Sequence, residues 1–241
     1  MIDKLESILK SAGEETFKHC VNVQKITEIL LQNEMLKDKF TEQQKQDIIN
    51  GARYHDIGKA LIDKDVLYAQ RRLTDQEFAL IKQHPVLGTQ ILFNNQAELN
   101  GVLDSDKQNQ ERAEVFKNIC QHHHTRPDGG YPPLEKGQVL PDYVEIVGLA
   151  DVFEALTAKR SYKEPMSVQE AHDLIVQGKC GGKFSPEIES LFENSLKDLE
   201  AYVNKSRNPS IAEFVAQKKE TINLEDNQTK ENIEKNETFE K

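Results

Sequence analysis

Residues 143–157 read YVEIVGLADVFEALT and form the most apolar stretch of the chain. The spacing of their apolar side chains is helical, which predicts a buried helix at the centre of the fold. Asp151 stands inside this stretch. Because an unpaired carboxylate is costly to bury, Asp151 indicates that a cation meets it there.

Helical periodicity continues outward in both directions, and no segment shows sustained alternation of apolar and polar residues. An apolar face predicts a helix over about residues 15–33. Three further helices are expected to begin with a capping box, in which a Ser or Thr is followed three residues later by Glu or Gln. These boxes are Thr41 with Gln44, Thr74 with Glu77, and Ser167 with Glu170.

Proline and glycine residues mark other helix limits. Pro85 is expected in the first turn of a helix, and Gly181-Gly182 is expected to close the helix that Ser167 opens. The helix opened by Thr41 is expected to extend to His55. The sequence therefore predicts an all-α protein, folded as a helical bundle.

Composition divides the 241 residues into three parts. Residues 1–14 are expected to form an N-terminal helical extension, and residues 15–204 carry the apolar helical pattern of the domain. Residues 205–241 are rich in Lys, Glu, Asn and Thr and contain few large apolar residues. Such a segment cannot bury enough surface to offset ordering, which predicts a mobile or loosely helical tail.

Charge and cysteine content limit which partners and which cellular compartment are expected. Lys+Arg number 31 against Asp+Glu 41, a net charge of −10, which argues against DNA binding. No apolar run approaches about 18 residues and the N-terminus lacks a secretory signal, so no membrane span or export is expected. Three widely spaced cysteines favour a reducing cytoplasm. An anionic substrate must then be held by bound metal or by a few placed cations.

Histidines and carboxylates recur at spacings that suit a metal site. Glu15 and His19 lie four residues apart, on one face of a helix. His55 and Asp56 are adjacent and would point about 100° apart on a helix, so both reach one site only if it lies between them or holds several metals. Taken alone, the pair is better explained as a helix cap. For the run His122–His124, an exposed polar segment is the alternative to a ligand role. Imidazoles with carboxylates suit Fe, Mn, Zn, Ni or Co.

Residues 55–59, His-Asp-Ile-Gly-Lys, resemble the signature of the HD superfamily of metal-dependent phosphohydrolases. The similarity continues in order along the chain through residues 73–77, 84–88, 122–124, 128–132, 150–157, 160–163 and 184–186. Over roughly residues 10 to 200 the chain resembles the HD-GYP subfamily, bacterial phosphodiesterases of cyclic di-GMP. The resemblance implies an HD-domain helical bundle with the additional C-terminal helices of HD-GYP proteins.

The resemblance also implies roles for individual residues. The matched metal ligands are His19, His55, Asp56, His84, His123, His124 and Asp151, with Glu15 where a subset of the family has a glutamate associated with a third metal. Asp56, as the bridging carboxylate, and Lys59, as a phosphate contact, are the implied catalytic residues. Implied substrate-binding residues are Lys59, Tyr131, Arg160 and Lys163.

The sequence departs from the family pattern in three places. Thr125 stands where the family has Glu after its histidine pair, and Ala69 and Gln70 stand where it has Lys and Pro. The loop over residues 128–132 is one residue shorter. That gap allows either His123-His124 or His122-His123 as the ligand pair, and we favour the first because a Gly-rich loop absorbs a deletion easily.

The implied reaction is hydrolysis of cyclic di-GMP to linear pGpG, with GMP as a further product, by a hydroxide bridging two or three divalent metals. Iron or manganese is favoured, and zinc, nickel or cobalt also suit. One alternative is an HD hydrolase of another cyclic dinucleotide or a nucleoside phosphate. The other is a non-catalytic module that either binds cyclic di-GMP or serves as a scaffold. A diguanylate cyclase or a separate sensory protein is the expected partner in bacterial signalling, and the oligomeric state stays open.

Overall fold

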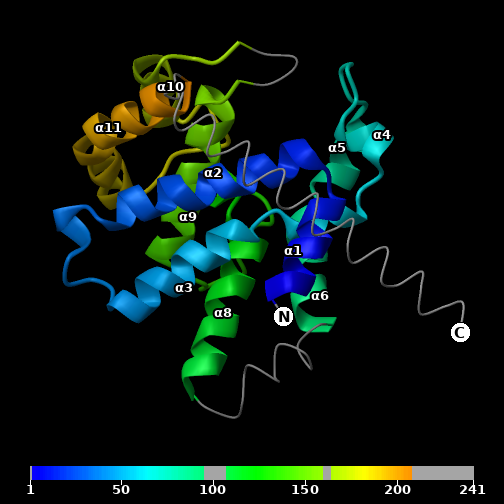
Figure 1. The fold of residues 1–241 in the computed structure, drawn as a ribbon, viewed down its shortest axis with the longest axis horizontal. Helices are drawn as coiled ribbons and strands as arrows, with labels where there is room; N and C mark the ends of the chain where they lie inside the picture. Colours follow the sequence, from blue (N-terminus) through cyan, green and yellow to red (C-terminus); the bar gives the residue numbers. More distant parts are fainter. Residues whose placement is uncertain (1, 95–106, 160–163, 208–241) are drawn as a thin grey trace, which may run out of the picture. The chain divides into compact units, whose positions relative to one another are not determined.

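The computed structural model describes residues 2–94, 107–159 and 164–207, which are mostly helical (Figure 1). The elements in chain order are α1 (Ile2–Ser11), α2 (Glu14–Leu31), η1 (Glu34–Leu36), α3 (Glu42–Arg53), η2 (Ile57–Leu61), α4 (Lys64–Leu67), α5 (Asp75–Ile81), α6 (His84–Asn94), α8 (Lys107–His122), β1 (Thr125–Arg126), β2 (Gly129–Gly130), α9 (Asp142–Thr157), α10 (Val168–Val176) and α11 (Pro186–Arg207). The predicted helical fold class is confirmed.

All three predicted capping boxes are present. In each box the backbone N–H of the Glu or Gln donates to the cap hydroxyl at 3.2 Å. The cap N–H donates in return to the Glu or Gln side chain at 2.9 Å. Each box satisfies donors that the first helical turn would otherwise leave open, so these helix starts are encoded locally.

Two helix ends differ from the prediction. α3 ends at Arg53, so the residues after it lie in a turn instead of extending the helix. α10 ends at Val176, and Gly178 takes a φ of 70° just beyond it, so the predicted stop at Gly181-Gly182 is wrong. Glycine tolerates this left-handed backbone at little cost, and the earlier glycine is sufficient to end the helix.

α9 is the central helix, as predicted. Its residues 144–151 are all buried. α2 packs along α9 and along α3, while α8 packs against α3 and α6 (Figure 1). α9 is therefore covered by helices that come from distant parts of the sequence.

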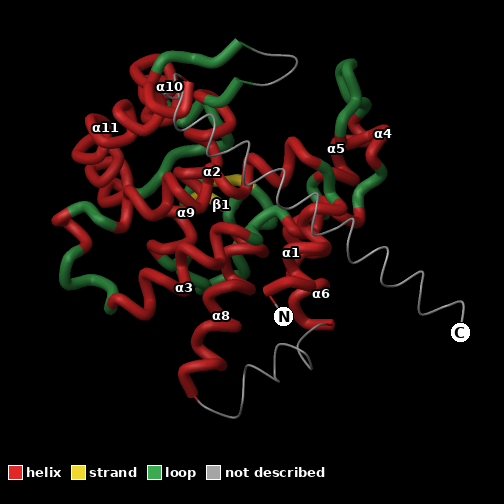
Figure 2. The backbone as a smooth tube through the Cα atoms, viewed as in Figure 1, coloured by secondary structure: helices red, strands yellow, loops and turns green. Residues whose placement is uncertain are grey.

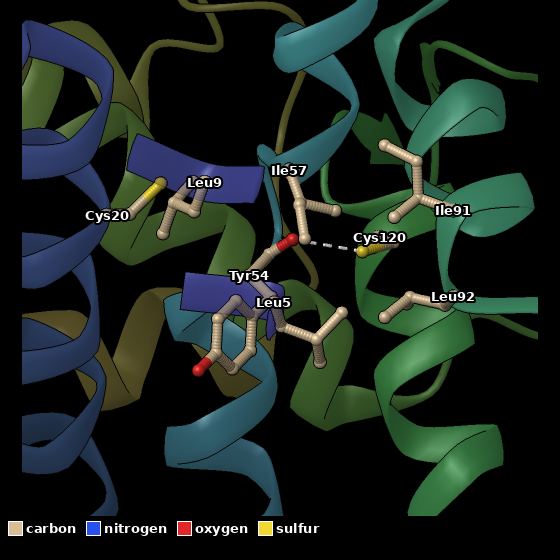
Figure 3. Packing of buried hydrophobic residues seen from close by; sticks show 8 residues of the cluster. All are labelled: Leu5, Leu9, Cys20, Tyr54, Ile57, Ile91, Leu92 and Cys120. Atoms are coloured by element: carbon tan, nitrogen blue, oxygen red, sulfur yellow. Dashed lines mark hydrogen bonds between the residues drawn. The ribbon is translucent and has the colours of Figure 1, made fainter. Parts of the chain in front are cut away.

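α1 contributes directly to the core. Leu5 and Leu9 are buried against Ile57 and the side chains around it (Figure 3). In the same cluster the Cys120 thiol donates to the Tyr54 carbonyl oxygen at 3.1 Å. The segment expected to be an extension thus packs within the compact body, which covers residues 1–199. The boundaries at residues 14 and 204 stay predictions, and residues 208–241 of the expected tail lie outside the described part.

The loop after α8, which the resemblance implies is one residue short, folds into a small hairpin. β1 and β2 pair antiparallel, with Thr125 opposite Gly130 and Arg126 opposite Gly129 (Figure 2). Gly130 takes a φ of 78°, and a Cβ there would lie 2.1 Å from the His124 carbonyl oxygen. The tight turn therefore depends on glycine at this position. None of the described helices has the length and apolarity needed to cross a membrane.

Candidate metal centre

Five separate segments deliver histidines and carboxylates to one place. α2 supplies His19, and the turn after α3 supplies His55 and Asp56. The remaining side chains come from the start of α6, the turn after α8 and the middle of α9, namely His84, His123, His124 and Asp151. Because α3 stops at Arg53, His55 and Asp56 are not held to helical spacing, and both side chains reach the same site.

Two glycines allow these segments to approach closely. A Cβ at Gly58 would lie 2.0 Å from the His84 carbonyl oxygen, so only glycine lets η2 pack directly on α6. A Cβ at Gly148 would lie 2.5 Å from the His123 carbonyl oxygen. The Arg126 guanidinium, 3% exposed, donates to the His123 carbonyl at 2.8 Å and to the Gly148 carbonyl at 3.4 Å. This contact fixes the histidine segment to α9.

Asp56 lies at the middle of the histidines. Its Oδ1 is 3.1 Å from His84 Nε2 and 3.7 Å from His123 Nε2. Its Oδ2 is 3.5 Å from His19 Nε2 and 3.4 Å from His55 Nε2. One carboxylate therefore faces four imidazoles, and each of its two oxygens lies near two of them.

Asp151 forms a second bridge across the same space. Its Oδ1 is 3.0 Å from His19 Nε2 and 3.7 Å from His55 Nε2. Its Oδ2 is 3.6 Å from His124 Nδ1. The carboxylate that the sequence placed in an apolar helix is thus buried among imidazoles.

Hydrogen bonds from Nδ1 orient four of the rings. His55 Nδ1 bonds the Ala52 carbonyl at 2.8 Å, His84 Nδ1 the Ile81 carbonyl at 2.7 Å, and His123 Nδ1 the Cys120 carbonyl at 3.0 Å. His19 Nδ1 bonds the Glu154 carboxylate at 2.5 Å. A ring that donates through Nδ1 presents an Nε2 lone pair, which is the form that binds metals.

The charges in the site are strongly coupled. Burial would raise the pKa of Asp56, but Lys59 and His55 outweigh it and hold that pKa well below the usual value. Burial would lower the pKa of His19, yet hydrogen bonds to Asp151 and Glu154 raise it to about 9. Burial and the neighbouring His124 keep the pKa of His123 well below its usual value. Both carboxylates are therefore ionised at neutral pH, and a metal would displace the proton on His19.

Several buried nitrogen and oxygen atoms have no hydrogen-bond partner and are suited to bind a cation. Asp56 Oδ1 and His55 Nε2 are buried without a hydrogen bond. His84 Nε2 and His123 Nε2 lie 3.2 Å apart although both rings donate through Nδ1, so two lone pairs face each other. Three groups have ligand atoms within 4.8 Å of one another: Asp56, His84, His123 and His124; His19, His55 and Asp151; and Cys20, His55 and Asp56. This donor set suits a divalent transition metal.

Comparison with known proteins identifies the family. The model of the HD domain family matches residues 6–188. The chain belongs to the HD domain family. The family that the sequence predicts is confirmed.

Relatives of this HD domain include a probable cyclic di-GMP phosphodiesterase of Vibrio cholerae, 33% identical over 193 residues, 78% of this chain and 42% of that protein. A 3'3'-cGAMP-specific phosphodiesterase 2 of the same organism is 33% identical over 145 residues, 60% of this chain and 25% of that protein. The chain thus spans less than half the length of these relatives. The HD domain of L. monocytogenes phosphodiesterase PgpH, solved with cyclic-di-AMP, shares the fold, with a TM-score of 0.52 and 17% identity over 83% of this chain and 96% of that one.

The structure distinguishes between the two possible histidine pairs of the HD domain. His123 and His124 both belong to the group around Asp56. His122 belongs to none of the three groups, and its Nδ1 lies 3.2 Å from Thr125 Oγ1. The geometry therefore favours His123-His124, and their role as ligands stays a prediction.

Other predicted residues lie at the edge of the centre. Lys59 Nζ is 2.5 Å from Asp56 Oδ2, and the Tyr131 ring stacks on His124 with centroids 4.7 Å apart. Glu15 lies one turn before His19 on α2 and lines a cavity with it, but it belongs to none of the three groups. Arg160 and Lys163 lie outside the described residues.

Two functional side chains were missed by sequence reasoning. Glu154 bonds His19 Nδ1, and Asn22 Nδ2 donates to the other Glu154 oxygen at 2.9 Å. Each lies three residues after a predicted ligand, Glu154 after Asp151 and Asn22 after His19. That spacing places them on the same helix face as the ligands and could have indicated them.

Proposed function

We propose that this HD domain is a metal-dependent phosphodiesterase that hydrolyses cyclic di-GMP to pGpG and then to GMP. The observation that supports this most strongly is the buried pair Asp56 and Asp151, each placed within 4 Å of ring nitrogens of several histidines. The relative named as a probable cyclic di-GMP phosphodiesterase supports the choice of substrate.

The residues that would hold the metals are His19, His55, Asp56, His84, His123, His124 and Asp151, with Glu15 as the additional ligand if a third metal binds. When bound, such metals act as Lewis acids and activate a water for attack on phosphorus. Two distinct groups of donors support two ions, and the mixture of imidazole and carboxylate favours iron or manganese.

Lys59 supplies a fixed positive charge beside the metals. Burial would lower its pKa, but Asp56 and Asp151 raise it, so the ammonium stays protonated at neutral pH. Its Nζ lies beside Asp56 with the side chain 20% exposed, which leaves donors free for a phosphoryl oxygen. A cation held there stabilises the negative charge that gathers in the transition state.

Tyr131 covers the histidine end of the site. Its ring stacks on His124, and Lys82 Nζ lies 5.4 Å from its ring centroid on the α5–α6 side. The phenol can therefore contact a substrate that approaches the metals past His124. Arg160 and Lys163 are proposed to bind substrate phosphate, as their family positions imply.

Another cyclic dinucleotide is the main alternative substrate. The relative specific for 3'3'-cGAMP is also 33% identical, over 145 residues against 193 for the one named for cyclic di-GMP. The hairpin ends directly before Tyr131, and we propose that its length influences which base is accepted. A substrate panel at equal enzyme concentration separates the candidates.

A non-catalytic binding module is the third possibility. Thr125, which replaces a family Glu, is used inside the hairpin, where its hydroxyl donates to the Pro132 carbonyl at 2.7 Å. The complete set of metal-binding side chains argues against loss of catalysis. Tight dinucleotide binding without turnover, in metal-replete protein, would support this reading.

The test is hydrolysis of cyclic di-GMP, 3'3'-cGAMP and cyclic-di-AMP by protein purified anaerobically, with metal content measured on the same sample. Replacing His55 and Asp56 by Ala should abolish turnover while circular dichroism stays helical. His172→Ala is the matched control, because His172 lies outside all three donor groups. Undiminished turnover without His55 and Asp56 would refute the mechanism.

The wider setting of the reaction stays a prediction. A cytoplasmic location follows from cysteine usage, and a diguanylate cyclase or a sensory protein is the proposed partner. Co-purification from the source cell tests the partner, and sedimentation of the purified chain tests whether it forms an oligomer.

A further inference from the structure

A cavity of about 540 Å³ opens beside the metal centre. His19 and Lys59 line it on the side of the metal centre. Its other wall comes from the segment that joins α4 to α5, including Arg71 and Arg72. This volume lies within the roughly 300–1,000 Å³ of small-molecule sites in proteins.

The outer wall of this cavity is attached to the body through Tyr68. The Tyr68 hydroxyl donates to the Ala12 carbonyl at 2.6 Å and lies 2.8 Å from Thr16 Oγ1. Gly13, with a φ of 115°, makes room, since a Cβ there would lie 2.5 Å from the Tyr68 hydroxyl. α4 and α5 themselves contain no buried residue. The position of the wall relative to α2 is therefore set by these polar contacts.

The two arginines of the wall have different surroundings. Arg71 makes a bidentate pair with Glu77, at 2.8 and 2.5 Å, so its charge is compensated and its side chain is fixed. Arg72 has no ion pair within the part of the chain that the structure describes, and its side chain is exposed. Among the described residues that line the cavity, Arg72 is thus the guanidinium that no carboxylate compensates.

The remainder of the lining is mainly apolar. Val66, Leu67, Leu73 and Ile81 contribute apolar side chains to it. Ala69 and Gln70, where the family has Lys and Pro, also line the cavity. The positive charge of this wall is therefore supplied by the next residues along the chain, Arg71 and Arg72.

We propose that this cavity is the subsite for the second nucleotide of a dinucleotide substrate, with Arg72 binding the phosphate that is not cleaved. This inference rests on the proposed function. One phosphate lies at the metals beside Lys59, the nucleoside packs on the apolar wall, and the second phosphate meets Arg72. A guanidinium forms paired hydrogen bonds to phosphate, and a mononucleotide has no group to fill this position.

The first test compares two substrates in metal-replete protein. Bis(4-nitrophenyl) phosphate has one phosphate, while cyclic di-GMP has two. Arg72→Ala should lower the ratio of kcat/KM for cyclic di-GMP to that for the nitrophenyl diester about tenfold, and Arg72→Glu should lower it further. Lys64→Ala is the matched control, since Lys64 is an exposed cation on α4 that does not line the cavity. A ratio that changes no more than in Lys64→Ala overturns the subsite.

The second test measures binding and does not depend on turnover. By isothermal titration, the unmodified chain should bind linear pGpG at least tenfold more tightly than GMP, and Arg72→Glu should remove most of that preference. A chain without the preference, or a preference that survives Arg72→Glu, overturns the subsite. If neither diester is hydrolysed, the proposed function fails, and this binding comparison still decides the role of Arg72.

Discussion

Asp56 and Asp151 are kept ionised by specific neighbours instead of by solvent. Both are buried, which would raise the pKa of each, and in both cases surrounding cations outweigh burial. For Asp56 the largest opposing influence is Lys59, and for Asp151 it is the hydrogen bond from His19. A site of this kind keeps two carboxylates negatively charged, and a divalent cation can compensate that charge. The residues that hydrogen-bond to the ligands therefore influence metal affinity.

Glu154 provides a direct test at the residue scale. Glu154→Gln should weaken metal binding about 10–100-fold, because the carboxylate that orients His19 and increases its basicity is lost. The measurement is a competition titration against a chromophoric chelator.

The control for that variant lies on the same helix. Glu145 is also a buried carboxylate of α9, but it accepts from the Ser185 N–H at 2.8 Å and belongs to none of the three donor groups. Glu145→Gln should reduce stability without changing metal affinity. Equal affinity losses in both variants would contradict the role given to Glu154.

At the scale of elements, the contact between η2 and α6 depends on Gly58. Gly58→Ala should destabilise the protein by about 2–3 kcal/mol and reduce metal binding, because the new methyl group meets the His84 backbone and one of the two segments must move. Urea unfolding and metal content are the measurements. Gly129→Ala is the control, since no atom lies within 4 Å of a Cβ there. A Gly58→Ala protein that binds metal normally would show that η2 and α6 can separate without effect.

The stability of the first turn of α5 should depend on pH because Glu77 titrates there. The Arg71 guanidinium and the Thr74 cap lower the pKa of Glu77 to about 2 from 4.5. Because the folded pKa is depressed, the stabilisation is complete above about pH 4.5 and is lost as pH falls toward 2. Glu77→Gln should therefore speed hydrogen exchange of the first α5 amides at pH 7, and the difference from the unmodified chain should shrink below pH 4.5.

Glu170 is the control for that effect. It occupies the same capping-box position in α10, without an arginine partner among the described residues. Glu170→Gln should give a smaller increase in hydrogen exchange of the first α10 amides at pH 7. A difference for Glu77→Gln that stays constant from pH 7 to pH 3 would show that the charge of Glu77 is not involved.

At the scale of the whole molecule, five segments each contribute side chains to the metal centre, so metal removal should lower global stability. A ligand at about 100 times its Kd stabilises the folded state by about 2.7 kcal/mol. For a domain of this size that corresponds to a Tm change of about 5–10 °C. Differential scanning fluorimetry of the full chain, with EDTA and then with Mn²⁺, measures the change.

Magnesium is the control for this experiment, because it prefers oxygen ligands and the site is rich in imidazole. Adding Mg²⁺ should recover little of the Tm that is lost with EDTA. A Tm that is the same with EDTA and with Mn²⁺ would show that the buried carboxylates and imidazoles are stable without a metal.

The sequence by itself determined the features that depend on local interactions. The capping boxes at Thr41, Thr74 and Ser167 and the apolar run of α9 follow from hydrogen bonds and periodicity within one helix, and they are present as predicted. The ordered motifs also indicated the HD domain family. The end of α10 was misplaced because Gly178, Gly181 and Gly182 are all able to stop a helix.

The tertiary structure alone decided what depends on contacts between distant segments. These include the turn that lets His55 and Asp56 face one site, the grouping of His123 and His124 with Asp56, and the bond from His19 to Glu154, 135 residues away. They also include the cavity between α2 and the segment carrying Arg72. Local propensity carries no information about such contacts, because they form only when segments from distant parts of the sequence pack together.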